Sequence, residues 1–331
     1  MSRYSADRVM KEGFATIELS DALSGSVADI VSDVGNNLFR FESKGRQAIM
    51  PPPSLSELKR QPFGYSEYGT PILFPPNRVK NGTFTYKGQE YRLPLNERSL
   101  YHLHGEIGAR PWEVTEFGAS EATGAFVTSR FKYEAHPDML AYFPHRLTFT
   151  ITYRLFDGQL HALGSIVNEG ELVSPFAFGF HPYFHLPSEE EGITVRIPAV
   201  AEWPVTNEAF VKGEPSVTPF SEQLNDGLPF ADYPKQGCSL LSLHEEADHT
   251  CYISMSNERY TIAYRFDHQF PFVVLFRPDW ASAVSLEPYT CVTDGFNLPY
   301  DHRLTGVRGI APGEEIGFAT SLWIEDEAFS K

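Results

Sequence analysis

Residues 147–167 read LTFTITYRLFDGQLHALGSIV, and this stretch decides the prediction of the fold. Apolar and polar side chains alternate from Leu147 to Leu155, as in a β-strand that buries one face. Asp157-Gly158 follows, a dipeptide typical of a two-residue hairpin turn, and residues 160–167 read as the returning strand. The sequence therefore predicts a long antiparallel hairpin near the middle of the chain.

Similar strand patterns lie on both sides of this hairpin. Residues 84–93 read as a second hairpin around Lys87-Gly88, residues 260–266 alternate again, and residues 272–276 form a short apolar run suited to a buried strand. The best helix candidate covers residues 54–61, where Ser54 could cap the start and Pro62 stops the end. Regular alternation of strands and helices, which a Rossmann fold or an α/β barrel requires, is absent.

Composition points in the same direction. Aromatic residues make up 14% of the chain, and 25 Gly and 25 Pro residues supply turns. No repeat or linker divides the sequence. We therefore expect an all-β fold, a large antiparallel β-sandwich with little helix, formed by residues 1–331 as one domain and carrying residues 207–234 as long loops.

The charge balance limits the classes of partner. Lys plus Arg number 27 and Asp plus Glu 43, which gives a net charge of −16 that repels nucleic acid and anionic membrane surfaces. The N-terminus has no apolar stretch typical of a signal peptide. Three cysteines without a C-x-x-C pair indicate reduced thiols rather than a disulfide framework. We expect a cytoplasmic protein that binds neither nucleic acid nor membranes.

Two residues that precede proline are the first candidates for chemistry. His181 stands among aromatic residues in FHPYF, and Glu287 stands in SLEPY. A residue before proline is restricted to extended backbone, which holds its side chain in a defined direction. A histidine and a carboxylate placed in this way could form an acid/base pair. His102 and His104, two residues apart, would share one face if that segment is extended.

Several blocks, in this order, carry a resemblance to the aldose 1-epimerase (galactose mutarotase) family. They are Phe74-Pro75-Pro76-Asn77-Arg78, Asn81-Gly82-Thr83-Phe84, Leu103-His104-Gly105, Asn168-Glu169-Gly170, Gly179-Phe180-His181-Pro182-Tyr183-Phe184, Glu287-Pro288-Tyr289-Thr290, Asn297 and Ala311-Pro312-Gly313-Glu314. The resemblance implies a large antiparallel β-sandwich. It also implies that the chain interconverts the α and β anomers of a small sugar without a cofactor.

The resemblance also assigns roles to individual residues. It implies that His181 is the general acid, Glu287 the general base, and Arg78 and His104 ligands of sugar oxygens. The family's substrate-binding aspartate has no clear motif here, and Asp248 is the best candidate, with Asp232 behind it. With these roles we expect a bell-shaped pH profile that has its carboxylate limb on the acid side and its imidazole limb on the basic side.

Several alternatives remain open at this point. The substrate could be a neutral hexose or a hexose 6-phosphate, since Arg78, Arg110 and Arg277 could bind an anionic group. The fold could also serve a non-catalytic sugar-binding protein. His102, His104 and Glu106 resemble part of a cupin metal site, although we expect no metal. Glu106 could equally be a sugar ligand, Trp112 and Trp280 could pack or cover the sugar, and the chain could be a monomer or a homodimer.

Overall fold

The computed structural model describes residues 2–59, 67–244 and 248–326. Its largest sheet has nine strands and contains the hairpin predicted at residues 147–167. In order across the sheet these strands are β11 (Glu113–Ser120), β12 (Gly124–Lys132), β13 (Leu147–Phe156), β14 (Gln159–Asn168), β27 (Glu315–Asp326), β23 (Tyr260–Phe266), β22 (His249–Met255), β18 (Ile193–Arg196) and β20 (Leu228–Pro229).

Two further sheets complete the layers. The seven-stranded sheet consists of β19 (Ala201–Trp203), β21 (Cys238–Ser242), β24 (Phe272–Phe276), β25 (Ala283–Tyr289), β16 (Gly179–Phe180) and β6 (Ile72–Leu73), with β17 (Tyr183–His185) also paired to β25. The five-stranded sheet is a meander of β1 (Tyr4–Lys11), β2 (Phe14–Asp21), β3 (Ser26–Val31), β4 (Asn37–Ser43) and β5 (Arg46–Gln47). The strand pairs within these sheets are antiparallel.

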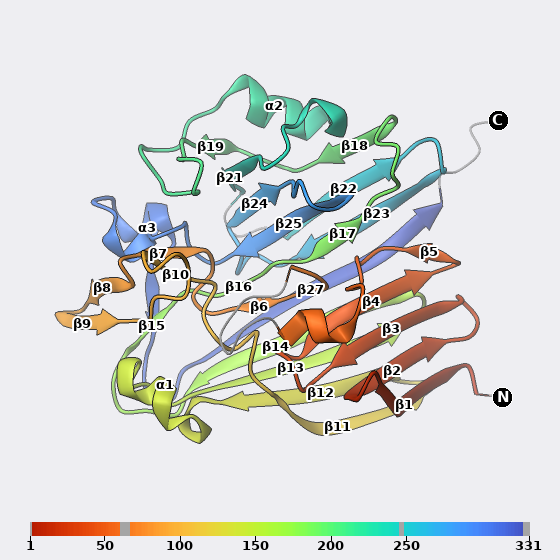
Figure 1. Ribbon diagram of the computed structural model, residues 1–331, viewed down its shortest axis with the longest axis horizontal. Coiled ribbons are helices and arrows are strands. Elements are labelled where there is room, and N and C mark those ends of the chain that lie inside the picture. The colour runs from red at the N-terminus through yellow and green to blue at the C-terminus, as the bar shows by residue number, and fades with distance from the viewer. Residues whose placement is uncertain (1, 60–66, 245–247, 327–331) are drawn as a thin grey trace.

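The main core lies between these layers. One cluster of buried side chains contains residues from the nine-stranded sheet, such as Phe149 and Ile151, and residues from the other two sheets, such as Leu19 and Leu275. In Figure 1 the red strands β1–β3 lie across β12 and β13, and contacts of β2 with both of these strands agree with this view. The predicted antiparallel β-sandwich is confirmed.

Three two-stranded ladders lie outside the large sheets, and two of them are at the left end of the molecule in Figure 1. These two are β7 (Arg78–Lys80) with β10 (Tyr101–Leu103), and the predicted hairpin of β8 (Thr83–Tyr86) with β9 (Gln89–Arg92). The third pairs β15 (Ser174–Phe176) with β26 (Arg308–Ile310). The β7–β10 ladder carries one of the predicted sugar-binding residues and ends directly before the other.

Helix is scarce in the described part of the chain, as expected. The α-helices there are α1 (Pro137–Tyr142), α2 (Pro219–Asp226) and α3 (His302–Thr305), and the 3-10 helices are η1 (Leu55–Lys59), η2 (Tyr133–Ala135), η3 (Phe230–Asp232) and η4 (Gly295–Asn297). None of the described helices has both the length and the apolar character needed to cross a membrane.

Two local predictions need correction. The helix predicted at residues 54–61 is a short 3-10 helix, η1, and its predicted end at Pro62 lies outside the described residues. Residues 207–234 are not simply loops, since they contain α2, β20 and η3. Thr218 caps α2 by accepting a hydrogen bond from the Ser221 backbone amide at 3.1 Å, a capping box that the sequence reading missed.

Candidate active site

Strand β25 presents three polar side chains on the outer face of the seven-stranded sheet. Val284 and Leu286 belong to the main core. Successive side chains of a strand point to opposite faces, so Ser285, Glu287 and Tyr289 point away from that core. This alternation places the Glu287 carboxylate beside a cavity on the outer face of the sheet and not in the core of the sandwich.

The same alternation operates in β16 and β17, both of which pair with β25. Phe180 and Phe184 belong to the main core, whereas His181 and Tyr183 line the same cavity as Glu287. Residues that lie 106 positions apart in the sequence, His181 and Glu287, are therefore neighbours in space because their strands pair.

The imidazole and the carboxylate are in direct contact. His181 Nε2 lies 3.2 Å from Glu287 Oε1, and their side chains are only 6% and 2% exposed. The Tyr289 hydroxyl donates a hydrogen bond to Glu287 Oε2. The Tyr183 ring stacks on the His181 ring with the centroids 4.5 Å apart, and its hydroxyl lies 3.4 Å from Nε2. Both partners are thus held on stiff backbone by neighbours that also fix their orientation.

Burial reverses the usual order of the two pKa values. It raises the pKa of Glu287 to about 8, against the opposing effects of the Tyr289 and Ser285 hydroxyls and of the Arg78 charge. Burial also lowers the pKa of His181 to about 3. These pKa values correspond at neutral pH to a protonated Glu287 and a neutral His181. The order of limbs expected from the sequence stays a prediction. These pKa values favour the opposite order, because ordinary pKa values leave out the cost of burying charge.

This order of the two pKa values predicts how kcat/KM depends on pH. We expect kcat/KM on a small sugar to stay level between about pH 5 and 7 and to fall above about pH 8, as the pair loses its single shared proton. The charged and titratable groups around Glu287 are His181, Tyr289 and Arg78, with Cys238 and His104 lining the same cavity. Initial rates of anomer exchange, corrected for the buffer rate at each pH, measure the profile. A rise in kcat/KM between pH 7 and 9 would contradict it.

The predicted sugar ligand Arg78 lies on β7 and is already engaged by a carboxylate. Its Nε and Nη2 donate to the two carboxylate oxygens of Glu97 at 2.6 and 2.7 Å, and Nη1 donates to the backbone carbonyl of Glu208 at 3.1 Å. Such a bidentate pair fixes the guanidinium in one plane. Arg78 lines the cavity in this orientation, so it can offer an edge to a sugar oxygen but no unpaired charge.

Arg78→Ala should damage both binding and folding. The substitution removes a cavity-lining donor, so KM should rise at least tenfold while kcat changes less. It also leaves Glu97, only 14% exposed, without its partner, which should lower the free energy of unfolding by about 1–3 kcal/mol. Urea unfolding and Michaelis kinetics measure the two effects. Arg92→Ala, which breaks the exposed pair with Glu90, is the control and should change neither quantity appreciably.

His104 directly follows β10, and its backbone is no longer extended. Its φ angle of 61° is left-handed, and its Nδ1 accepts a hydrogen bond from the Asn77 backbone amide at 3.1 Å. The ring meets His181 edge to face, with centroids 5.3 Å apart, and burial lowers its pKa well below the ordinary value. His104 is therefore a neutral imidazole that carries its proton on Nε2.

The cavity shared by these residues has a volume of about 240 Å³. Trp280, 38% exposed, stands at its rim against Tyr183, with ring centroids 5.6 Å apart. Asn207, Gln236 and Cys238 add further polar atoms to the wall. An aromatic ring beside several hydrogen-bonding groups suits a small molecule with apolar C–H faces and many hydroxyls.

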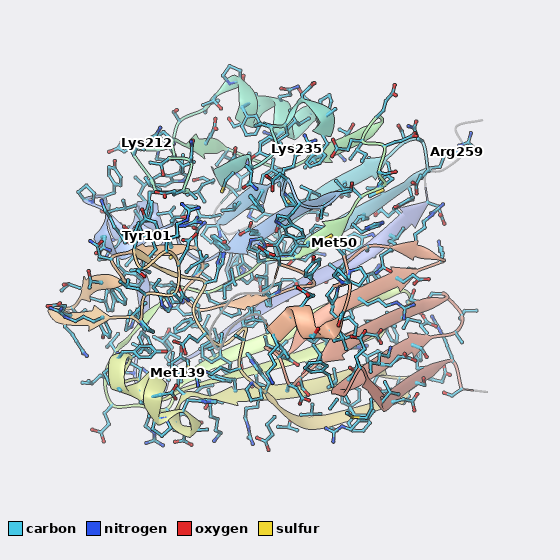
Figure 2. The ribbon with its side chains drawn as sticks, in the orientation of Figure 1. Met50, Tyr101, Met139, Lys212, Lys235 and Arg259 are labelled. Atoms are coloured by element: carbon cyan, nitrogen blue, oxygen red, sulfur yellow. The ribbon has the colours of Figure 1, made fainter. Side chains whose placement is uncertain are left out.

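The segment that precedes α2 contributes Asn207 to the wall of the cavity. The Tyr101 hydroxyl of β10 donates to Glu208 at 3.0 Å, and its ring packs edge-on against Phe210 at 5.0 Å. Tyr101 and Lys212 accordingly lie on the same side of the molecule in Figure 2. These contacts join residues 206–212 to the ladder that carries Arg78.

The structure does not bring the aspartate candidates to this cavity. Asp248, with a side chain 43% exposed, precedes β22 of the nine-stranded sheet and pairs with Arg265. Asp232 ends η3 and is exposed. Neither lines the cavity that His181 and Glu287 share. The cavity's carboxylates apart from Glu287 are Glu67 and Glu97, among the described residues.

The three arginines considered as ligands of an anionic group do not converge. Arg110 pairs with Glu106 and Asp138, and Arg277 donates to Glu190 and to two backbone carbonyls. Only Arg78 of these three lines the cavity.

The cupin-like arrangement does not form either. His102 and Glu106 line a separate apolar cavity, whereas His104 turns into the candidate site because of its left-handed backbone. The expected common face for His102 and His104 is therefore wrong. Within the ranges that the structure describes, no three His, Cys, Asp or Glu side chains are grouped to hold a metal ion. His102 is buried and bonds to the Pro94 carbonyl at 2.7 Å.

The sequence reading missed several contributors to the site. Tyr183 and Tyr289 stood inside quoted blocks, and the period of two could have assigned them to the face of His181 and Glu287. Glu97 carries no local signal, since its pairing with Arg78 depends on the ladder of β7 and β10. Trp112, in contrast, is buried and donates to the Ile107 carbonyl at 2.9 Å, so it is a packing residue.

The sequence model of the family described as aldose 1-epimerase matches residues 16–323, and the chain belongs to that family. A solved galactose mutarotase-like protein from Clostridium acetobutylicum has a TM-score of 0.87 at 24% identity, covering 97% of this chain and 98% of that one.

Two curated relatives are matched over part of their length. The protein YihR of Escherichia coli K12 is 34% identical over 119 residues, so this chain spans about a third of it. Galactose mutarotase of Sus scrofa is 26% identical over 185 residues, which cover 54% of this chain and 51% of that protein. These partial matches do not identify the substrate of this chain, which has to be argued from the site.

Proposed function

We propose that this chain interconverts the α and β anomers of an uncharged aldose by opening and closing the sugar ring. The observation that carries this proposal is the buried contact of 3.2 Å between His181 Nε2 and Glu287 Oε1 in a cavity of sugar size. Opening a pyranose needs one group to take the proton of the C1 hydroxyl and another to protonate the ring oxygen. Two groups that share one proton suit this reaction.

His181 and Glu287 together gain or lose no proton over one cycle of opening and closing. In opening, Glu287 takes the proton from the C1 hydroxyl and His181 delivers its proton to the ring oxygen, so the proton of the pair moves from His181 to Glu287. The open aldehyde then turns about its C1–C2 bond. In closing, Glu287 returns its proton to the oxygen on C1 while His181 takes the hydroxyl proton on C5.

The protonation that these pKa values favour fits the second half of this cycle. Glu287 protonated and His181 neutral is the arrangement that closing requires. Transfer of the proton across the 3.2 Å contact gives the arrangement that opening requires. Because the reaction is reversible, both arrangements are used in each turnover, and neither needs a proton from solvent.

The charge pattern of the cavity supports a neutral substrate over a sugar phosphate. Arg78 and Arg98 line the cavity, and both face carboxylates, Glu97 at 2.6 Å and Glu208 at 3.5 Å. A phosphate recognised in this part of the described chain would have to compete with those carboxylates for the guanidinium donors. A neutral hexose would accept single hydrogen bonds without separating the pairs.

Exchange of anomeric NMR signals tests the proposal across a panel of sugars. We expect saturable acceleration with glucose, galactose and other neutral aldoses, and little or none with glucose 6-phosphate or galactose 6-phosphate. Acceleration confined to the phosphates would establish the 6-phosphate reaction instead. Binding of neutral sugars without acceleration would establish a non-catalytic sugar-binding protein.

We also propose a cytoplasmic location for this chain. Cys238, Cys251 and Cys291 are free thiols, which supports a reducing compartment.

A further inference from the structure

We propose that Ser285 is a positioning residue that holds the ring proton of neutral His181 on Nδ1, so that Nε2 faces Glu287 as a proton acceptor. This inference rests on the proposed function and adds to it the atom that accepts the proton. The family resemblance gives Ser285 no role as an acid, a base or a sugar ligand.

The hydrogen-bond inventory of Ser285 carries the argument. Its Oγ lies 2.7 Å from the Pro182 carbonyl oxygen and 2.9 Å from His181 Nδ1. A carbonyl oxygen only accepts, and a hydroxyl has a single hydrogen. Whether that hydrogen goes to the Pro182 carbonyl or to the carboxylate of Glu287, whose pKa the Ser285 hydroxyl helps to lower, it does not go to His181. A lone pair of Ser285 Oγ is then left to accept from His181 Nδ1, which must carry the ring proton.

The backbone keeps this geometry in place. Ser285 lies fully buried on β25, opposite Tyr183 of β17 and Phe276 of β24. The His181 backbone amide donates to the Pro71 carbonyl at 3.0 Å, and the Tyr183 ring stacks on the imidazole. The ring therefore cannot turn to exchange its two nitrogens without breaking contacts on both sides.

The other nitrogen faces the carboxyl group. With the ring proton on Nδ1, His181 Nε2 is a bare acceptor 3.2 Å from Glu287 Oε1. The proton in that contact then belongs to Glu287, as the burial of the carboxyl group also favours. In the opposite tautomer an N–H would meet the O–H of Glu287, and no proton could pass between them.

His104 provides an internal comparison. Its Nδ1 accepts from the Asn77 backbone amide, which puts its proton on Nε2. The cavity thus contains two neutral imidazoles in opposite tautomers. A backbone N–H donor sets the tautomer of His104, and a hydroxyl that accepts sets the tautomer of His181. A donor imidazole suits a sugar oxygen, whereas an acceptor imidazole suits proton transfer.

Nitrogen-15 NMR of the histidine rings tests the tautomer without any substrate. In wild-type protein at pH 7 we expect His181 to show a protonated Nδ1 and an unprotonated Nε2, and His104 the reverse. The two rings are assigned by the signals lost in His181→Asn and His104→Asn. A protonated Nε2 on His181 in the wild-type spectrum would overturn the proposal, whatever the activity of the protein.

Ser285→Ala tests the consequence for catalysis. We expect the His181 signals to report both tautomers and KM to stay within about twofold. We expect kcat to fall by about 10- to 100-fold, the scale on which hydrogen-bond partners orient metal-bound histidines. The control is Ser174→Ala, because Ser174 is also fully buried and donates to a carbonyl, that of Pro175 at 3.0 Å, outside the site. It should keep the wild-type kcat and His181 signals.

The outcomes separate this inference from the proposed function. Unchanged kcat and an unchanged Nδ1 proton in Ser285→Ala would refute the role of Ser285 even if wild-type protein is an active mutarotase. Wild-type protein that accelerates no sugar would refute the proposed function, while the ring signals would still decide the tautomer. If Ser285→Ala does not fold, Ser285→Cys and the wild-type spectrum supply the same two readouts.

Discussion

Glu287→Gln should lower kcat by about 10²- to 10⁴-fold and leave KM within a few-fold of the wild-type value. The amide keeps the shape of the protonated carboxyl group: its NH₂ can donate to His181 Nε2 and its oxygen can accept from Tyr289. It cannot give or take a proton. The loss therefore falls on the chemical step, and sugar binding is largely spared.

The same substitution should stabilise the protein at neutral pH. The pKa of Glu287 is about 8 in the folded protein and ordinarily 4.5, so its contribution to stability is complete below pH 4.5 and is lost as pH rises towards 8. Each pH unit in that window costs about 1.4 kcal/mol. Glutamine has no such loss, so at pH 7 the variant should be more stable by about 3 kcal/mol, with the gap closing near pH 4.5.

Thermal unfolding from pH 4.5 to 8 and steady-state kinetics measure both effects. Glu106→Gln is the matched control, because Glu106 is equally buried but is paired with Arg110. That variant should lose stability and keep its kcat. If Glu287→Gln retained kcat near wild type, Glu287 would not be the proton-transfer group. If the variant lost stability at pH 7, the Glu287 carboxyl group would be ionised in the wild-type protein without substrate.

His181→Asn should cut kcat by about 10²-fold or more, again with a smaller change in KM. The asparagine NH₂ can replace Nδ1 as the donor to Ser285, so the local packing is kept, but the atom that faces Glu287 is lost. Combining it with Glu287→Gln should cost less than the product of the two single losses, because each transfer is useful only with the other.

A second histidine gives a close control for this variant. His161 on β14 also places Nδ1 against a serine hydroxyl, that of Ser321 at 2.8 Å, but it lies on the nine-stranded sheet. His161→Asn should therefore keep the wild-type kcat. Circular dichroism checks that each variant is folded. Equal losses in His161→Asn and His181→Asn would show that the effect is on folding and not on proton transfer.

Much of the fold could be predicted because its signals are local. Residues 147–167 show period two and an Asp-Gly turn, and they form β13 and β14 with Leu147 opposite Asn168. The short helices were harder: α2 has only eight residues, and its start rests on the single capping box of Thr218 and Ser221. The pairing of β27 between β14 and β23 also has no local signal, because it joins residues far apart in sequence.

The candidate site could also be predicted only in part. His181 and Glu287 could be singled out because each precedes proline within a recognisable block, and strand pairing brings them to 3.2 Å. Their protonation could not be predicted, because it depends on burial that only the assembled fold creates. No motif marks Asp248 as a sugar ligand, and its ion pair with Arg265 on another sheet accounts for its position.

Polarimetry of a freshly dissolved α-anomer tests the central claim most directly. Wild-type protein and the double variant His181→Asn/Glu287→Gln would be compared at equal concentration, on a neutral aldose at pH 7, against buffer alone. The account predicts a rate well above buffer for wild-type protein and a rate close to that of buffer for the double variant. A double variant as fast as wild type, or wild-type protein no faster than buffer with every neutral aldose tried, would contradict it.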